Sequence, residues 1–292
     1  MSPSHGKSKA KSSGKSIVVI YHTSCPDGFG AAYAAWKKFG ARADYRPVSY
    51  SERPLDLRGK EVYFLDLVYK PDALRRVLKE AKRVVVIDHH ATAKPSVALV
   101  KESRYEMKHS GAVLAWKYFH PKKHVPKLLL HVEDEDLWNF KLKGTQAVNA
   151  RLELIGFDLQ KWDKAVRDFE KPAARKKFIA EGELLAAYRT KVVRRLASEG
   201  AVPVRFLGHR VLAVNATRPF HSELGNLLYK IKPPIGIIWQ EKPGGIGVSL
   251  RSDGTVDVAK IAQRFGGGGH KAAAAFRLPR GAKKPWTYDD KA

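Results

Sequence analysis

Residues 17–40 read IVVIYHTSCPDGFGAAYAAWKKFG, and this stretch decides the fold class. The run IVVIY is apolar and β-branched, which predicts a buried strand. After a short polar turn, small and aromatic side chains recur at helical spacing from Ala31 to Phe39, and Gly40 marks the end of the helix. The stretch therefore predicts a strand, a loop and a helix.

The same pattern returns further along the chain. EVYFLDL at 61–67 and RVVVID at 83–88 are apolar runs of strand length, and Pro71 opens a predicted helix between them. Apolar strands that alternate with helices are typical of a parallel sheet covered on both faces. We therefore expect an α/β fold, with a parallel-sheet domain over residues 17–155.

The rest of the chain divides by composition. Residues 1–16 are mostly Ser, Gly and Lys and predict a disordered basic tail. Residues 156–200 set apolar side chains among many charges, which indicates a helical connector. Residues 201–278 show the hairpin and helix patterns of a smaller α/β domain, and 279–292 are expected to form a frayed tail.

Charge and cysteine content limit the classes of function. The 292 residues include 54 Lys and Arg against 29 Asp and Glu, a net charge of +25. Residues 1–16 and 277–292 carry +4 and +3 of it, which leaves +18 on the folded part. This surplus favours phosphate-rich partners, although a charged surface that only keeps the protein soluble would look the same.

A single Cys excludes a disulfide framework and a cysteine-rich zinc module. The sequence shows neither an apolar leader segment nor an 18-residue apolar run, so we expect a cytoplasmic protein without a membrane partner.

Side chains with the chemistry of metal ligands follow the predicted strands. In an open parallel sheet the carboxyl ends of the strands meet at one crevice. The groups placed there are His22 with Cys25 and Asp27, then Asp66, then Asp88, His89 and His90, and finally Asp134 or Asp136. Taken singly, each Asp is equally compatible with a helix cap. Together, carboxylates mixed with imidazole favour manganese or another octahedral divalent cation, and ligands from four segments would allow a two-metal site.

Two glycine-rich motifs differ from the familiar phosphate-binding loops. Gly28 and Gly30 lack the third glycine of a dinucleotide-binding loop, because Tyr33 stands at its position. The glycines at 266–269 do not form a P-loop, because no Lys followed by Ser or Thr comes after them. They could still bring backbone N–H groups close to an anion, and a plain flexible turn is the other interpretation.

Two further motifs carry a resemblance to a known family. IDHHAT at 87–92 resembles the signature of the DHH phosphoesterases, and FGGGGHKAAAAF at 265–276 resembles the Gly-Gly-Gly-His-x-x-Ala-Ala-Gly motif of their associated C-terminal domain. YHTSCPDG at the first strand and Asp66 at the second stand in the family's order. The resemblance covers residues 17–276. It implies a hydrolase of phosphodiester or phosphoanhydride bonds that uses one or two Mn²⁺ ions, with Mg²⁺ as the other option.

The resemblance also implies roles for individual residues. The implied metal ligands are His22, Asp27, Asp66, Asp88 and Asp134, with Cys25 beside them; the implied catalytic residues are Asp88, His89 and His90. The implied substrate-binding residues are Arg251, Gly267, Gly268, Gly269, His270 and Lys271. The sequence departs from the family at Cys25, where a first aspartate is usual, and at Ala275, where the motif ends in Gly.

We therefore expect a phosphoesterase that acts on short single-stranded oligonucleotides or small phosphorylated nucleotides through metal-activated water. The alternative, from a different class, is a basic nucleic-acid-binding protein with a weakened metal site. The sequence leaves open the bond cleaved, the end polarity, the choice among RNA, DNA and small nucleotides, and the oligomeric state.

Overall fold

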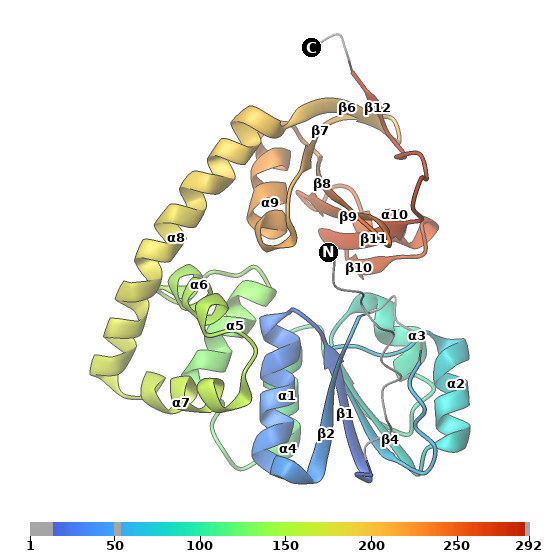
Figure 1. Ribbon diagram of the computed structural model, residues 1–292, viewed down its shortest axis with the longest axis vertical. Helices are drawn as coiled ribbons and strands as arrows, with labels where there is room; N and C mark the ends of the chain where they lie inside the picture. The colour runs from blue at the N-terminus through green and yellow to red at the C-terminus, as the bar shows by residue number, and fades with distance from the viewer. Residues whose placement is uncertain (1–13, 50–53, 290–292) are drawn as a thin grey trace, which may run out of the picture. The chain divides into compact units, whose positions relative to one another are not determined.

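The computed structural model describes residues 14–49 and 54–289 (Figure 1). The chain divides into two compact units, one formed by residues 1–89 and 93–178 and the other by residues 90–92 and 179–292. The tail predicted for residues 1–16 lies outside the described residues, apart from its last three.

The first unit is built on a five-stranded sheet in the order β2-β1-β3-β4-β5, with every neighbouring pair parallel. Its strands are β1 Ile17–His22, β2 Ala43–Val48, β3 Glu61–Leu65, β4 Arg83–Asp88 and β5 Glu102–Tyr105. The expected α/β class with a parallel sheet is confirmed. Because the chain moves from β1 to β2 on one side and then to β3 on the other, the sheet reverses its winding between β1 and β3. Ligands of open α/β sheets bind at the carboxyl ends of strands beside such a point.

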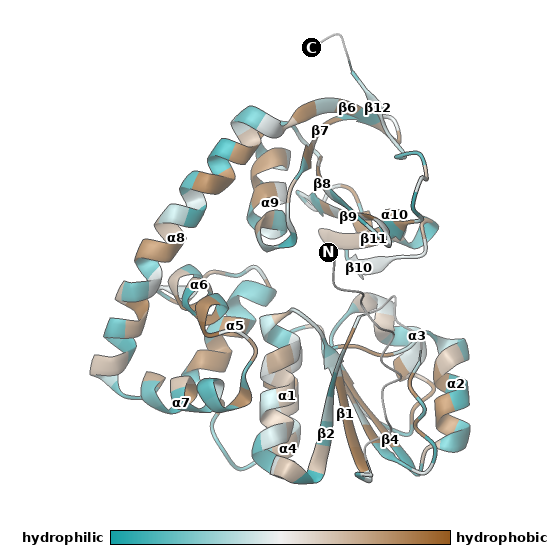
Figure 2. Ribbon diagram, viewed as in Figure 1, coloured by the Kyte–Doolittle hydropathy of each residue, from teal (hydrophilic) through white to brown (hydrophobic). Residues whose placement is uncertain are grey.

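Helices cover both faces of this sheet (Figure 1). α1 Pro26–Phe39 and α4 Gly111–Phe119 lie on one face, and α2 Pro71–Glu80 and α3 Lys94–Val97 lie on the other. Figure 2 shows β1 as hydrophobic, in line with its four buried central residues. The short 3₁₀ turns η1 Gly40–Arg42 and η2 Ala91–Ala93 belong to the loops.

Three more helices continue the first unit beyond α4. They are α5 Lys127–Asp136, α6 Thr145–Ile155 and α7 Leu159–Phe169. α5 packs against α1, α4, α6 and α7. The fully buried Trp162 of α7 lies edge-on to Phe29 of α1, with 4.9 Å between the ring centroids. This packing fixes α5, which carries two of the acidic residues considered below.

The second unit contains a mixed seven-stranded sheet in the order β10-β11-β9-β8-β7-β6-β12. The long helix α8 Pro172–Gly200 leads into it, and α9 His221–Ile231 and α10 Val258–Arg264 complete it with the short turn η3 Arg218–Phe220. β7 and β8 are parallel, and the other pairs are antiparallel. The strands are β6 Val202–Phe206, β7 His209–Asn215, β8 Ile235–Lys242, β9 Gly245–Ser252, β10 Gly268–His270, β11 Ala273–Leu278 and β12 Thr287–Tyr288.

The C-terminal stretch differs from the frayed tail expected at 279–292. β12 pairs antiparallel with β6, and Trp286 is buried against Phe206 in the core of the second sheet. Burial of a large indole in an apolar core is stabilising, so Trp286 keeps the C-terminal stretch folded against the second sheet. None of the helices in the described part of the chain is both long and apolar enough to span a membrane.

Candidate metal centre

Asp66 lies at the point where the parallel sheet reverses its winding. It directly follows β3 with a left-handed φ of 56°, and its N–H donates to the carbonyl of Ile87 on β4 over 2.9 Å. Its Oδ1 lies 3.1 Å from Nε2 of His89, and its Oδ2 lies 3.5 Å from Nδ1 of His22. The carboxylate of Asp66 therefore joins the ends of three neighbouring strands.

The imidazole of His89 gathers three carboxylates. Its Nε2 lies 3.1 Å from Asp66, 3.4 Å from Asp27 and 3.5 Å from Asp136. Burial lowers the pKa of His89, but the hydrogen bond with Asp66 and the charges of Asp136 and Asp27 outweigh it and raise the pKa to about 11. One imidazolium cannot balance three carboxylates, so the cluster has the charge and the ligand atoms to hold a divalent cation.

Asp27 is held by the start of another helix. It is 1% exposed, and its two oxygens accept hydrogen bonds from the N–H groups of Gly111 and Ala112 at the start of α4, over 2.7 and 2.8 Å. Burial raises the pKa of Asp27 well above its usual value, and the nearby charges of Asp136 and Asp66 add to the effect. The N–H groups of Gly111 and Ala112, which have no partner within the helix, oppose this by favouring the charged carboxylate.

The residue types of two adjoining groups suit metal binding. Asp27, His89 and Asp136 each offer one ligand atom, and these atoms lie within 4.8 Å of one another. The same holds for His22, Cys25 and Asp66. Oxygen and nitrogen ligands predominate in the first group, whereas the second includes a thiol, so the two groups differ in the metals that they favour.

The remaining residues of the predicted set lie nearby in sequence. Asp88 ends β4 and is fully buried, and its Oδ1 accepts a hydrogen bond from the N–H of His89 over 2.7 Å. His90 belongs to the three-residue segment that is grouped with the second unit. The signature at 87–92 thus contributes His89 to the cluster and Asp88 directly beside it.

The structure gives different surroundings to the two candidate aspartates of α5. The carboxylate of Asp134 accepts hydrogen bonds from the N–H groups of Lys141 and Leu142, both over 2.9 Å, and from the hydroxyl of Thr145 over 2.6 Å. Asp136, by contrast, reaches His89. We therefore replace Asp134 by Asp136 in the proposed ligand set, because the oxygens of Asp134 are engaged in holding the following loop.

Replacing these two aspartates by Asn should produce opposite results. Asp136→Asn should lower metal content with little change in melting temperature. Asp134→Asn should keep metal binding but cost about 2 kcal/mol of stability, because an amide NH₂ would then face backbone donors. Hydrogen bonds from Thr145, Leu142 and Lys141 outweigh burial and lower the pKa of Asp134. This stabilisation should be present above pH ~4 and lost as the pH falls further. Metal analysis and thermal melts at several pH values would measure both effects.

Sequence reasoning missed Gly111 and Ala112, which act through backbone N–H groups. An added Cβ at Gly111 would lie 2.7 Å from the Cβ of Asp66 and 3.0 Å from Oδ2 of Asp27. The only signal in the sequence was the Ser-Gly-Ala triplet at the start of a predicted helix. Such a triplet is common at helix ends and does not point to a particular carboxylate.

In the second unit, Arg251 of β9 is a half-buried residue whose guanidinium is held by hydrogen bonds. It donates to the hydroxyl of Ser222 over 2.8 Å and to the carbonyl of Leu250 over 3.0 Å. Burial lowers its pKa to about 10, so it stays charged near neutral pH. Within residues 14–49 and 54–289 it forms no ion pair with a carboxylate, which leaves its charge available to an anion.

The glycines at 266–269 do not all have the role expected for them. The N–H of Gly267 donates to the carbonyl of Ala262, and an added Cβ would lie 2.1 Å from the carbonyl oxygen of Ala275. Gly269 has a φ of 143°, and its added Cβ would lie 2.5 Å from the carbonyl oxygen of Ala273. These two glycines are needed for the close approach of β10 and β11. Gly268, His270 and Lys271 stay as the proposed phosphate-binding part of the motif.

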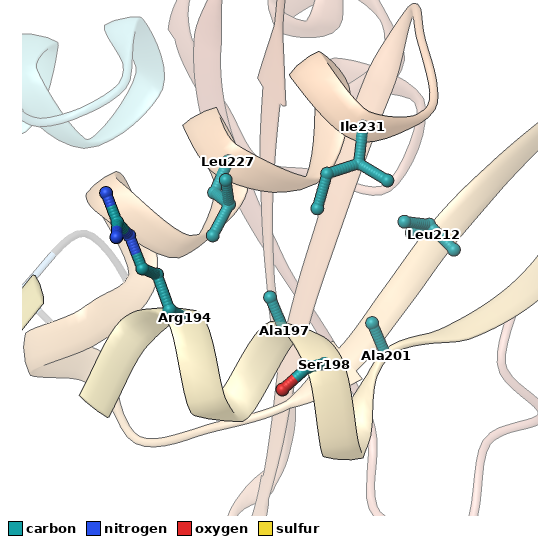
Figure 3. A pocket seen from close by; sticks show the side chains of 7 residues that line it. All are labelled: Arg194, Ala197, Ser198, Ala201, Leu212, Leu227 and Ile231. Atoms are coloured by element: carbon teal, nitrogen blue, oxygen red, sulfur yellow. The ribbon is translucent and has the colours of Figure 1, made fainter. Parts of the chain in front are cut away.

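A pocket in the second unit has different chemistry from the metal centre (Figure 3). It is lined by Arg194, Ala197, Ser198, Ala201, Leu212, Leu227 and Ile231. The lining includes neither a carboxylate nor an imidazole, so this pocket is not a candidate for hydrolysis.

Comparison with known proteins identifies a domain in the second unit. Residues 221–285, which include Arg251 and the glycine-rich motif, match the model of the DHHA1 domain. The second unit thus carries a DHHA1 domain, the C-terminal domain associated with the DHH phosphoesterases. This finding confirms the resemblance carried by the two motifs.

Two curated proteins are similar to this chain in sequence. Uncharacterized protein R106 of Acanthamoeba polyphaga mimivirus is 30% identical over 287 residues, covering 89% of this chain and 66% of that protein. Oligoribonuclease NrnB of Bacillus subtilis (strain 168) is 34% identical over 100 residues, covering 34% of this chain and 25% of that protein. The chain thus spans less than two thirds of the length of either. Among solved structures, an uncharacterized protein from Helicobacter pylori G27 has a TM-score of 0.46 and 13% identity, covering 92% of this chain and 94% of that chain.

The departure at Cys25 leads to a prediction on metal choice. Cys25→Asp should tighten Mn²⁺ binding about tenfold, because a hard carboxylate replaces a softer thiol ligand. Cys25→Ser should change turnover by less than about threefold, since we expect no covalent step at the thiol. Calorimetric titration with Mn²⁺ and steady-state rates would test both variants. Loss of all hydrolysis in folded Cys25→Ser would show instead that the thiol is essential.

Proposed function

We propose that this chain is a divalent-metal-dependent phosphoesterase. Its substrates are short single-stranded oligonucleotides or small phosphorylated nucleotides, in which it hydrolyses phosphodiester or phosphomonoester bonds. Mn²⁺ is the proposed metal, and Mg²⁺ is the other candidate. The DHHA1 domain at residues 221–285 and the sequence similarity to an oligoribonuclease of Bacillus subtilis support this proposal.

One observation carries the proposal. Asp27, Asp66 and Asp136 come from three separate segments, yet all lie within 3.5 Å of the same nitrogen of His89. Like charges at this spacing oppose folding unless a cation compensates them. Asp27 and Asp66 are buried, so a bound cation would stabilise the fold by compensating their charges.

The residues fit the expected metal, because buried carboxylates and imidazoles are ligands that Mn²⁺ accepts. A bound divalent cation would supply charge stabilisation of the phosphoryl oxygens and activation of water. Asp27 is oriented for this role by α4, and Asp66 is oriented by its backbone bond to β4. His89 can hold a proton close to the reacting oxygens, which suits assistance to a leaving group.

The second unit supplies the proposed substrate anchor. The charged Arg251 can grip a phosphate with two parallel hydrogen bonds, and His270 and Lys271 add positive charge in the glycine-rich motif. Contacts with a phosphate group that does not react supply binding energy, and this energy can position the phosphate group that does react.

A substrate screen tests the proposed function. Full-length protein with Mn²⁺ would be offered 3′-phosphoadenosine 5′-phosphate, phosphorylated dinucleotides, short RNA, single-stranded DNA and pyrophosphate. We expect turnover of at least one base-bearing substrate, and its loss with chelator. No turnover of any of them by metal-loaded protein would refute the proposal.

Arg251→Gln should separate the anchor from the metal centre. It should raise KM about tenfold, because a charged hydrogen bond to phosphate is lost, and leave metal content unchanged. Steady-state kinetics with a phosphorylated dinucleotide, together with metal analysis, would measure this. A fall in metal content would contradict the assigned role.

The alternative class is a basic nucleic-acid-binding protein with a weakened metal site. The net charge of +25 and the thiol of Cys25 favour it. It predicts binding that weakens steeply with salt and no hydrolysis under any metal. The substrate screen, run beside a binding titration at several salt concentrations, separates the two functions.

A further inference from the structure

The loop after α5 holds two aromatic residues in an unusual backbone conformation. Trp138 and Phe140 have φ values of 57° and 49°, in the left-handed region that bulky side chains rarely adopt. Such strain persists only where surrounding contacts enforce it, and it is concentrated at functional sites. We call residues 137–143 the Trp138 loop.

Asp134 holds the loop in this conformation through both its backbone carbonyl and its side-chain carboxylate. Its backbone carbonyl accepts hydrogen bonds from the N–H groups of Asn139 and Phe140, and its carboxylate accepts those of Lys141 and Leu142. A single residue therefore holds four consecutive N–H groups of the loop, which accounts for the buried position of the Asp134 carboxylate.

The loop begins directly beside the metal centre. Asp136, whose carboxylate lies 3.5 Å from Nε2 of His89, precedes Trp138 by two residues. Two residues of chain span at most ~7 Å, so the Cα atom that carries the indole lies within about the length of one nucleotide of the Cα atom of Asp136.

The indole is both supported and accessible. Its ring meets that of Phe140 edge-on, with 4.7 Å between the centroids and an angle of 78° between the planes. Trp138 is nevertheless 37% exposed, and the side chains of Lys141 and Lys143 in the same loop are exposed as well. An accessible aromatic ring next to cations is the arrangement with which proteins bind single-stranded nucleic acids, by stacking a base and pairing its phosphates.

We propose that Trp138 is a base-stacking platform that selects substrates carrying a nucleobase next to the scissile phosphate. The inference rests on the proposed phosphoesterase function and narrows its substrate class. A base-bearing oligonucleotide or nucleotide gains the stacking contact, whereas pyrophosphate and polyphosphate cannot.

Matched substrates test this selection. A 5′-phosphorylated adenine dinucleotide would be compared with its abasic analogue, which keeps the sugars and phosphates. Trp138→Ala should raise KM for the dinucleotide roughly tenfold to a hundredfold and leave KM for the abasic analogue unchanged. Trp138→Phe should recover most of the loss. Tyr188→Ala, which removes a 71% exposed ring from α8, serves as the control and should affect neither substrate.

A binding measurement makes the result independent of turnover. Adenosine monophosphate should quench part of the tryptophan fluorescence of the wild type, inorganic phosphate should not, and the quenching should vanish in Trp138→Phe. The proposal is overturned if Trp138→Ala raises KM equally for the adenine dinucleotide and its abasic analogue and the quenching persists in Trp138→Phe. The ring would then only support the loop. If the wild type hydrolyses neither the adenine dinucleotide nor its abasic analogue, the proposed function fails. The fluorescence measurement still decides whether a base stacks on Trp138.

Discussion

Asp66→Asn should lower turnover at least about a thousandfold, equivalent to about 4 kcal/mol of transition-state stabilisation. Asp66 is the carboxylate that reaches both His22 and His89, so its charge bears on both candidate metal groups. Asn is the suitable replacement because it tolerates the left-handed φ of 56°, whereas Ala would add backbone strain. Turnover and metal content of the purified variant would measure the loss.

Stability measurements separate this effect from unfolding. Without metal, Asp66→Asn should melt close to the wild-type temperature, because relief of the repulsion from Asp27 and Asp136 offsets the weaker hydrogen bond to His89. Mn²⁺ should raise the melting temperature of the wild type and not that of the variant. Asp72→Asn makes the same chemical change at a carboxylate that is 96% exposed, and it should alter none of these quantities. Metal binding and turnover that survive in Asp66→Asn would refute the assigned role.

The part of the site that sequence could predict follows from a local rule. His22, Asp66 and Asp88 stand at the ends of apolar strands, and parallel strands end at the same edge of a sheet. The order of the strands was not needed for this prediction, because any parallel arrangement would bring those ends to one edge. Apolar runs and the residues that follow them were sufficient.

The choice between Asp134 and Asp136 could not be made in this way. Both lie on α5, and two residues of α-helix correspond to a rotation of roughly 200°, so they point to different sides. Which side faces the cluster depends on how α5 packs against α1, α4, α6 and α7, and that packing is tertiary. The folded C-terminal stretch escaped prediction for a similar reason, since Trp286 finds its partner Phe206 80 residues away in the chain.

Gly111→Ala provides the second large expected effect. Ala is the better helix former by about 1 kcal/mol, so propensity alone predicts a more stable α4. The added methyl carbon, however, would lie 2.7 Å from the Cβ of Asp66, which is closer than real Cβ contacts allow. α4 or β3 must therefore shift, and either movement disturbs Asp27 and Asp66 together. We expect Mn²⁺ affinity and turnover to fall about a hundredfold, similar to the loss of a residue that orients a metal ligand.

Gly247→Ala is the matched control for this substitution. Its added Cβ would lie 3.8 Å from the nearest atom, the carbonyl oxygen of Gln240, which is an ordinary contact. Metal affinity should be unchanged there, because β9 belongs to the second unit. Calorimetry with Mn²⁺ and circular dichroism would compare the two variants. If Gly111→Ala binds Mn²⁺ as tightly as Gly247→Ala while both stay folded, the cluster of Asp27, Asp66 and Asp136 tolerates displacement and does not form the metal centre.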